Sequence, residues 1–500
     1  MKKYVSKVLV FILAVSIMFT AAACVVKTEH VDDQKSTSGQ KDTESKTNDN
    51  QVHEEVSKKP KKITAMLDVI LPEEDGRDKF LEEYKKMTGI ELEIINPPHQ
   101  QYYEKMHLAF ASEDIPDILE TQGSEMVNYV LEGAFVDLDP YYKKSAILQT
   151  ITPALIDGQR VNGKLYGFPI AMGGGTITYL RKDWMEKLNL SAPSTFDELY
   201  EIMKQFTFSD PDGNDKDDTV GYVAAGITDG MYLRDFYQDA TVGFDFKDGK
   251  WVDGFTQPEM IPALERLRNA YQDKIIDPEI FTNNTSTARE KFYGGKAGIW
   301  TYWAGAWGRV INETMKQNYG EESGIIPIPA IKGSYYFNRV ATANCITVKA
   351  EDPEAVFKWY IEFMHDGAEG QMLFTHGVEG VHWTKKDGKY EKLPMLSDSS
   401  KQFNKTVITS SLQLTPWKDP FNPDPMETES NKIWEQNLKQ VLLVPASETY
   451  KQSGSDINTL KEKIVAKIMI GEMTIEEGLK QYNVQAKDLD IGKILEELNQ

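Results

Sequence analysis

Hydrophobic and polar positions alternate in the early part of the chain in the way that is typical of β-strands. Residues 63–69 carry an apolar side chain at every second position, and residues 90–94 repeat this pattern. Between them, residues 80–87 place their apolar side chains on one helical face, and Gly89 follows as a helix stop. The order predicts a β-α-β unit whose parallel strands are joined by a right-handed connection.

Signals for the start of a helix recur further along the chain. Thr195–Glu198 and Thr474–Glu477 have the form of capping boxes, and Asp352–Glu354 combines a capping aspartate with a proline and an acid in the first turn. No repeat of fixed period accompanies them. Helices and strands mixed in this way predict an α/β fold, and 500 residues are enough for two lobes with additional tails.

The first 23 residues have the composition of a secretory signal peptide. Lysines at positions 2, 3 and 7 precede an apolar run from Val8 to Ala23, which is short for a membrane span and ends in small residues. The ending also resembles a bacterial lipobox, in which Cys24 is lipidated and becomes the first residue of the mature protein. The alternative is ordinary cleavage after small residues; we favour lipidation because a cysteine stands at the cleavage point.

Residues 24–60 are rich in charged and small polar residues and poor in large apolar ones. Such a segment cannot bury enough surface to offset the entropy lost on folding, so we expect a disordered tether. The whole chain carries a formal net charge of −21, which argues against nucleic-acid binding. Its two cysteines, Cys24 and Cys345, exclude both a disulfide framework within the body and a cysteine zinc site.

Six segments in this order resemble motifs of a known family, the extracellular solute-binding proteins of ABC importers, in the maltose-binding-like group of sugar-binding lipoproteins. The segments are Lys85–Ile90, Ala111–Ile118, Asn162–Pro169, Tyr179–Trp184, Pro193–Leu199 and Glu379–Trp383. Each alone is a weak signal, and Asn162–Pro169, which reads NGKLYGFP, is the most specific. Their order across residues 61–500 makes the resemblance strong.

The resemblance implies a two-lobe periplasmic-binding-protein-like fold, with a helix-flanked β-sheet in each lobe and the ligand in the cleft between them. By this analogy residues 61–171 with 323–370 form one lobe, and residues 172–322 with 371–500 form the other. It further implies a monomeric lipoprotein on the extracellular face of the bacterial cell membrane. Such a protein binds a sugar or oligosaccharide and delivers it to the permease subunits of an ABC importer.

Residues 210–218 have the spacing of a calcium-binding loop. Asp210, Asp212, Asn214 and Asp218 supply oxygen side chains at alternating positions, and Lys216 offers a backbone carbonyl. The loop is not an EF-hand, because Asp215 stands where that motif needs glycine. We expect one structural calcium ion; the alternative is a solvated Asp-Gly turn.

Aromatic residues concentrate between Trp300 and Trp307, where four rings occur within eight residues. Aromatic faces pack on the C–H faces of sugars, and a few polar groups then bind the hydroxyls. Because side chains alternate along a strand, Trp300 and Tyr302 should lie on one face, and Thr301 and Trp303 on the other. We expect one of these two sets to be core. The candidate ligand-binding residues are Tyr102, Tyr103, Phe168, Gly174, Tyr179, Trp300, Tyr302, Trp303, Trp383 and Trp417.

Signals of catalysis are absent from the sequence, which has neither a Gly-x-Ser-x-Gly elbow nor a His-Glu-x-x-His motif. We therefore expect a binding protein rather than an enzyme. Two alternatives stay open. One is a secreted carbohydrate-active hydrolase or lyase, and the other is a surface lipoprotein that kept the fold without transport.

Overall fold

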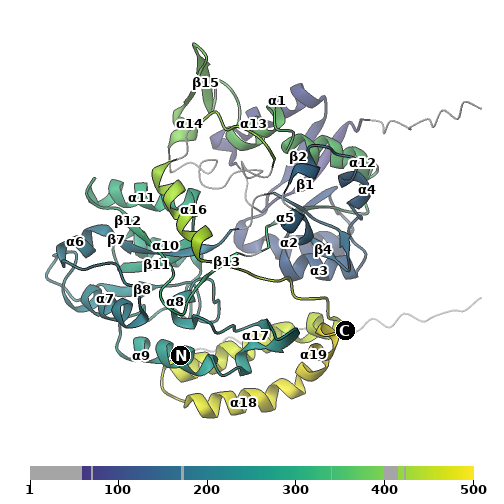
Figure 1. The fold of residues 1–500 in the computed structure, drawn as a ribbon. Coiled ribbons are helices and arrows are strands. Elements are labelled where there is room, and N and C mark those ends of the chain that lie inside the picture. Colours follow the sequence, from purple (N-terminus) through teal and green to yellow (C-terminus); the bar gives the residue numbers. More distant parts are fainter. Residues whose placement is uncertain are drawn as a thin grey trace, which may run out of the picture. The chain divides into compact units, whose positions relative to one another are not determined.

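A computed structural model of the chain describes residues 59–68, 71–151, 153–170, 174–338, 340–398, 415–421 and 424–500 (Figure 1). The predicted signal peptide, Cys24 and most of the predicted tether lie outside these residues, as do Met172 and Gly173. Among the described helices, none combines the length and the apolar character that crossing a membrane requires.

The first sheet is built on the predicted β-α-β unit, which is confirmed. β1 (Lys62–Met66) pairs in parallel with β2 (Glu91–Ile95), and α1 (Arg77–Thr88) connects them. Gly89 ends α1 with a φ of 71°, a left-handed conformation that suits glycine. β3 (Ile118–Thr121) lies parallel to β1 on its other side, and β14 (Ala343–Ile346) runs antiparallel to both β3 and β6 (Phe168–Pro169). The strand order is β2-β1-β3-β14-β6.

Helices enclose this sheet because its strands carry apolar side chains on both faces. Ile63 and Ile118 are fully buried in a cluster that also contains Phe80, Tyr360 and Phe374. The elements around the sheet are η1 (Glu73–Asp75), η2 (His99–Gln101), α2 (Tyr102–Ser112), α3 (Gly123–Leu131), α4 (Asp139–Tyr142), η3 (Leu148–Thr150), α5 (Pro153–Asp157), α12 (Pro353–Val356), the π-helix η5 (Phe357–Glu362) and α13 (Glu369–His376).

In the NGKLYGFP segment, a tight turn at Asn162-Gly163 joins a short hairpin, β4 (Arg160–Val161) with β5 (Lys164–Leu165). Both turn residues have positive φ, 51° at Asn162 and 79° at Gly163, which is the conformation that an Asn-Gly pair favours in a two-residue hairpin loop.

The second sheet has four strands in the order β12-β7-β11-β8. β7 (Thr176–Arg181) runs antiparallel to β11 (Ala297–Trp303) and to β12 (Ile325–Ile328), whereas β8 (Val220–Val223) lies parallel to β11. The elements around it are α6 (Lys182–Lys187), α7 (Phe196–Phe208), α8 (Arg234–Tyr237), the hairpin β9 (Phe244–Lys247) with β10 (Lys250–Asp253), η4 (Gly254–Thr256), α9 (Met260–Gln272), α10 (Thr285–Tyr293), α11 (Ala306–Tyr319) and α16 (Pro425–Asn437). The capping box predicted at Thr195–Glu198 starts α7.

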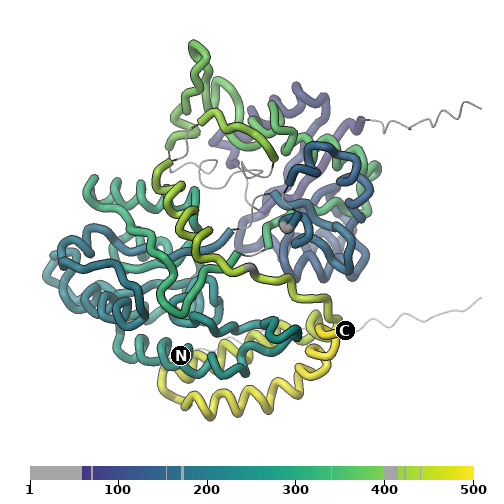
Figure 2. The backbone as a smooth tube through the Cα atoms, viewed as in Figure 1, coloured from purple at the N-terminus to yellow at the C-terminus, as the bar shows by residue number. Residues whose placement is uncertain are grey.

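Three C-terminal helices, α17 (Glu448–Met469), α18 (Ile475–Asp488) and α19 (Ile491–Leu498), complete the chain, and α17 packs against α9 (Figure 2). On α17 a lysine is buried with its counter-ion, which ends β10. Lys461 Nζ lies 3.0 Å from Asp253 Oδ1 and donates to the Val242 carbonyl, while Tyr482 donates to Asp253 Oδ2 at 2.7 Å. Burial lowers the pKa of Lys461.

Strand pairing and core contacts differ from the expected division into lobes in two places. Residues 323–370 were expected with the first sheet, but β12 hydrogen-bonds to β7 and so belongs to the second. Residues 371–500 were expected with the second sheet, but Leu373, Phe374, Val378 and Trp383 pack in the first core. The hairpin β15 (Trp383–Lys386) with β16 (Lys389–Lys392) and the helix α14 (Pro394–Ser397) follow there. The remaining strand pair is β13 (Tyr336–Asn338) with β17 (Leu438–Gln440), which run parallel.

We expect Lys461→Ala to destabilise the protein by about 3–5 kcal/mol, because removing one partner of a buried pair leaves the other charge uncompensated. The free energy of unfolding, measured by urea titration, checks this. Lys463→Ala is the control, since Lys463 is exposed on the same helix. Equal stability of the two variants would contradict the assigned role of the pair.

Candidate functional site

The aromatic run on β11 ends in a group of rings that we call the aromatic group: Tyr232, Tyr302, Trp303 and Trp307. Tyr302 stacks on Tyr232 with ring centroids 6.1 Å apart and meets Trp307 edge to face at 5.1 Å. Tyr302 is 5% exposed, whereas Tyr232, Trp303 and Trp307 are half-buried. The aromatic group therefore contains one buried ring, that of Tyr302, and three rings whose surface remains partly accessible.

The position of Trp303 is set by glycines at the start of β7. A Cβ at Gly174 would lie 3.4 Å from Cζ3 of Trp303, so the indole rests directly against this backbone. At Gly175 a Cβ would overlap the Phe337 carbonyl and the indole nitrogen of Trp434. The backbone at these glycines is thus closely approached by other groups of the protein itself, which leaves no room for a side chain at position 175.

Four of the predicted ligand residues are core residues in this structure: Tyr102, Phe168, Tyr179 and Trp300 are each at most 1% exposed. Their burial does not support direct contact with a ligand. Three of them support the site instead. The Tyr179 hydroxyl donates to the Trp303 carbonyl at 2.8 Å, Trp300 stacks on Tyr302 at 4.2 Å, and the Tyr102 hydroxyl donates to the carbonyls of Met66 and Glu120.

Both faces of β11 are covered, which the alternating pattern alone does not reveal. Trp300 packs against Phe292 on one face, and Thr301 is fully buried on the other, where its hydroxyl meets that of Thr178 at 2.8 Å. Accessible ring surface therefore begins only where the strand ends, at Trp303 and beyond.

Of the two remaining tryptophans of the prediction, Trp383 lies in the first core and Trp417 lies beside His376 of α13. Trp383 is 9% exposed, and its indole nitrogen donates to the Gly377 carbonyl at 3.0 Å. Trp417 is half-buried, with its ring centroid 5.9 Å from that of His376. No contact joins either of them to the aromatic group among the described residues.

A polar group that the sequence did not single out lies at the ends of β1 and β3: Asp68, His99 and Glu120, here called the acid–histidine group. Asp68 Oδ1 lies 2.8 Å from His99 Nδ1, and the Asp68 amide donates to Glu120 Oε2 at 3.2 Å. The carboxyl ends of parallel strands are the usual place for ligands in α/β sheets. Asp68, a polar residue near the end of the predicted strand over residues 63–69, was the available signal.

The surroundings of this group shift the pKa values of its side chains. Burial, and then the neighbouring Asp68 carboxylate, raise the pKa of Glu120 to about 8. The hydrogen bond that His99 makes to the Asp68 carboxylate raises the pKa of His99, whereas burial and the positive charge of Arg289 act in the opposite direction. Of the predicted residues, half-buried Tyr103 belongs here, because the charges of Asp68 and Glu120 act on its hydroxyl; burial raises its pKa to about 12.

The predicted calcium loop brings several of its oxygen atoms together. Asn214 Nδ2 donates to Asp212 Oδ2 at 2.7 Å and to Asp218 Oδ1 at 3.1 Å, and Asp218 Oδ2 lies 2.7 Å from Lys296 Nζ. Burial and a hydrogen bond with Asp210 raise the pKa of Asp212, as expected where two carboxyl groups adjoin. Turning the Asn214 amide would point its oxygen at the same centre. The donor set thus fits a hard cation, although no cluster of three or more histidine, cysteine or acidic residues poised for a metal occurs within the described ranges.

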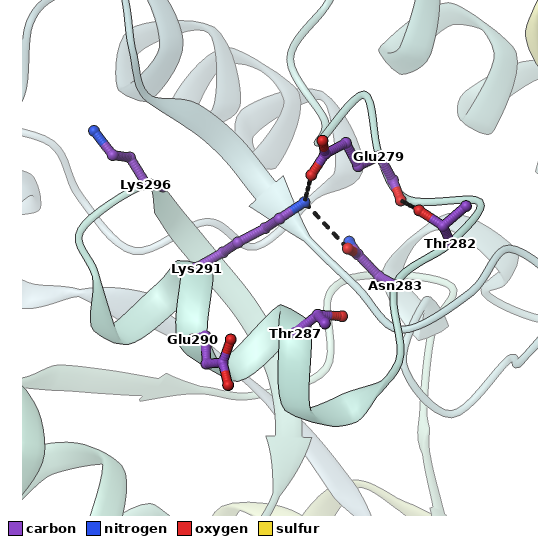
Figure 3. Close-up of a pocket in the computed structure, with 7 residues that line it drawn as sticks. All are labelled: Glu279, Thr282, Asn283, Thr287, Glu290, Lys291 and Lys296. Carbon is purple, nitrogen blue, oxygen red and sulfur yellow. Dashed lines mark hydrogen bonds and ion pairs between the residues drawn. The ribbon is translucent and has the colours of Figure 1, made fainter.

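A polar hollow of about 430 Å³ lies near this loop but contains none of the predicted ligand-binding residues (Figure 3). Lys291 points across it and bonds to Glu279 Oε2 at 2.7 Å and to Asn283 Oδ1 at 3.1 Å. Because its central cation already has protein partners and the lining carries no aromatic ring, we do not assign the ligand to this hollow.

Comparison with known proteins places this geometry in a family. The polygalacturonan/rhamnogalacturonan-binding protein YtcQ of Bacillus subtilis (strain 168) is 24% identical over 445 residues, which are 81% of this chain and 84% of YtcQ. Lipoprotein LipO of the same organism is 25% identical over 480 residues, 91% of each chain.

Among solved structures, the ABC-transporter substrate-binding protein FusA of Streptococcus pneumoniae in complex with kestose matches with a TM-score of 0.64, 18% identity, and coverage of 88% of this chain and 98% of FusA. An EF-hand mutant of FusA in complex with fructo-nystose matches with a TM-score of 0.62 at the same identity and coverage. These likenesses confirm the two-lobed α/β fold of periplasmic binding proteins. Residues 72–364, more than half of the chain, match the family described as bacterial extracellular solute-binding protein, and the chain therefore belongs to that family.

Proposed function

We propose that this protein binds a sugar or oligosaccharide between its two lobes and delivers it to the permease subunits of an ABC importer. The observation that carries the proposal is the aromatic group at the end of β11, where half-buried Trp307 meets Tyr302 edge to face and half-buried Trp303 follows as the last residue of the strand. Ring faces of this kind pack on sugar C–H faces, and the acid–histidine group supplies acceptors for hydroxyls.

The names of relatives support a carbohydrate ligand, since YtcQ is named for polygalacturonan and rhamnogalacturonan and FusA was solved with kestose. We infer that the protein performs no chemistry on its ligand and acts as a monomer. A closed form in which both lobes touch the ligand would tie delivery to occupancy. The hydrolase or lyase alternative predicts product from a sugar, and a surface lipoprotein without transport would bind sugar yet support no uptake.

The division into lobes remains a proposal, with crossings shifted to match the strand pairing. We place residues 59–170 with 340–398 and 415–421 in one lobe, and residues 174–338 with 424–500 in the other. The shift moves β12 to the second lobe and the β15–β16 hairpin to the first.

We expect Trp303→Ala to weaken binding of the cognate sugar by roughly 30-fold, because central aromatic contacts typically contribute about 2 kcal/mol or more. A calorimetric screen of fructo-, galacto- and galacturono-oligosaccharides identifies the ligand first. Trp251→Ala is the matched control, a half-buried tryptophan in the β9–β10 hairpin. Unchanged affinity of the Trp303 variant would contradict the site, and accumulation of a cleaved sugar would favour the hydrolase.

We further propose one structural calcium ion at Asp210, Asp212, Asn214, Asp218 and the Lys216 carbonyl. A chelator should lower the melting temperature, and added calcium should restore it. At 100 times its dissociation constant, calcium should raise the free energy of unfolding by about 2.7 kcal/mol. Asp212→Asn should abolish the response. Asp217→Asn should retain it, because this neighbouring exposed carboxylate lies outside the ligand pattern. A melting temperature that ignores both chelator and calcium would refute the ion.

Finally, we propose that Cys24 carries a lipid anchor that holds the protein on the extracellular face of the bacterial membrane. Expressed in a bacterium, the Cys24→Ala variant should move from the membrane fraction to the soluble fraction outside the cytoplasm. Cys345→Ala is the control and should stay with the membrane, because Cys345 is buried in the first sheet. Persistent membrane attachment of the Cys24 variant would exclude this anchor.

A further inference from the structure

Arg289 stands beside the aromatic group and, in the part of the chain that the structure describes, has no carboxylate partner. Its guanidinium carbon lies 5.0 Å from the ring centroid of Trp307 and 5.9 Å from that of Tyr302. Its one hydrogen bond, to Ser286 Oγ, is long at 3.4 Å, and no carboxylate within the described ranges forms an ion pair with it. The side chain is half-buried against these rings, so it is oriented by them and stays partly accessible.

The surroundings of Arg289 add to its positive potential. Trp307 belongs to the first turn of α11, a helix whose N-terminus has no side-chain cap, so the positive end of the helix dipole lies near the same rings. The charge of Arg289 also acts on His99 of the acid–histidine group. Arginine at such a position, with planar donors and aromatic stacking, suits a carboxylate better than a neutral hydroxyl.

The carboxyl groups of the acid–histidine group do not oppose an anionic ligand as strongly as their number suggests. Asp68 is bonded to His99 at 2.8 Å, which offsets its charge when the imidazole is protonated. Burial keeps the pKa of Glu120 at about 8, so this carboxyl is largely neutral at pH 7 and can donate a hydrogen bond to a sugar oxygen. The overall charge of −21 still repels anions, and the positive charge of Arg289 at the rings counteracts this repulsion locally.

We propose that Arg289 binds the carboxylate of an acidic sugar, so that the ligand is an oligosaccharide containing uronic acid. This inference rests on the proposed function and narrows it, since it names a charged substrate class and the residue that selects it. Stacking on Tyr302 and Trp307 orients the guanidinium, so a uronate ring placed on the aromatic group would present its carboxylate to the fork.

The test compares each uronate with its uncharged counterpart. Trisaccharides of galacturonate, mannuronate and guluronate, and the methyl ester of each, are titrated calorimetrically into the full-length protein in detergent. Wild type should bind at least one uronate at least 10-fold more tightly than its ester. Arg289→Gln should weaken that uronate roughly 10- to 100-fold and leave the ester unchanged, because a hydrogen bond to a charged group is lost.

Two further variants keep the result interpretable. Arg289→Lys keeps the charge but lacks the planar fork, so it should retain only part of the preference. Arg268→Gln on α9 removes the same charge from an arginine that donates to Asn269, and it should bind like wild type. The melting temperature of each variant confirms that it is folded.

Three outcomes would overturn the inference, and they separate it from the proposed function. Binding of fructo- or galacto-oligosaccharides but of no uronate would refute the acidic ligand and leave sugar binding intact. A preference for uronates that survives in Arg289→Gln would refute the role of this residue. Failure to bind any sugar of either panel would refute the proposed function and this inference with it.

Discussion

The close approach of three chain segments at Gly175 is the constraint on which the candidate site depends. The indole nitrogen of Trp434 donates to the Phe337 carbonyl at 3.0 Å, and both groups fill the space that a Cβ at position 175 would need. The Gly175 carbonyl in turn accepts from the Ala304 amide at 3.0 Å, directly after Trp303. The start of β7, the end of β11 and the helix α16 are thus fixed to one another by a single residue without a side chain, and the accessible rings are placed by this contact.

Buried polar groups beneath the second sheet stiffen the platform that carries those rings. The Thr178 hydroxyl donates to Asp235 Oδ2 at 2.6 Å and also meets the hydroxyl of Thr301, so β7, β11 and α8 are joined across their buried faces. Burial raises the pKa of Asp235 to about 6. A network of this kind orients its members strongly because an unpaired member would be costly in a low dielectric.

Local sequence patterns predicted the elements well because their causes are local. The alternation that begins at residue 63, the helix stop at Gly89 and the capping box at Thr195 each depend on neighbours in sequence, and the strand β1, the end of α1 and the start of α7 confirm them. Which faces of β11 are covered depends on helices elsewhere in the chain, so Trp300 could not be separated from Trp303.

Isolated polar residues such as Glu120 and Arg289 carry no pattern of their own. Their roles become visible only in the folded structure. There the end of β3 and the helix α10 lie close enough for the charges of Glu120 and Arg289 both to act on His99. The pairing of β12 with β7 likewise had no sequence signal, because an antiparallel strand can join either sheet.

Cys345 has a practical consequence for observing motion in this protein. It is the one free thiol within the described ranges, it is fully buried in β14, and burial raises its pKa far above the range in which thiolates form at neutral pH. Maleimide and nitroxide reagents react with the thiolate of accessible cysteines. They should therefore not label Cys345, and this residue need not be mutated before labelling. A pair of cysteines introduced on exposed positions near each sheet could then carry spin labels or fluorophores against a clean background, and the distance distribution between them would report directly on how the two lobes move in solution.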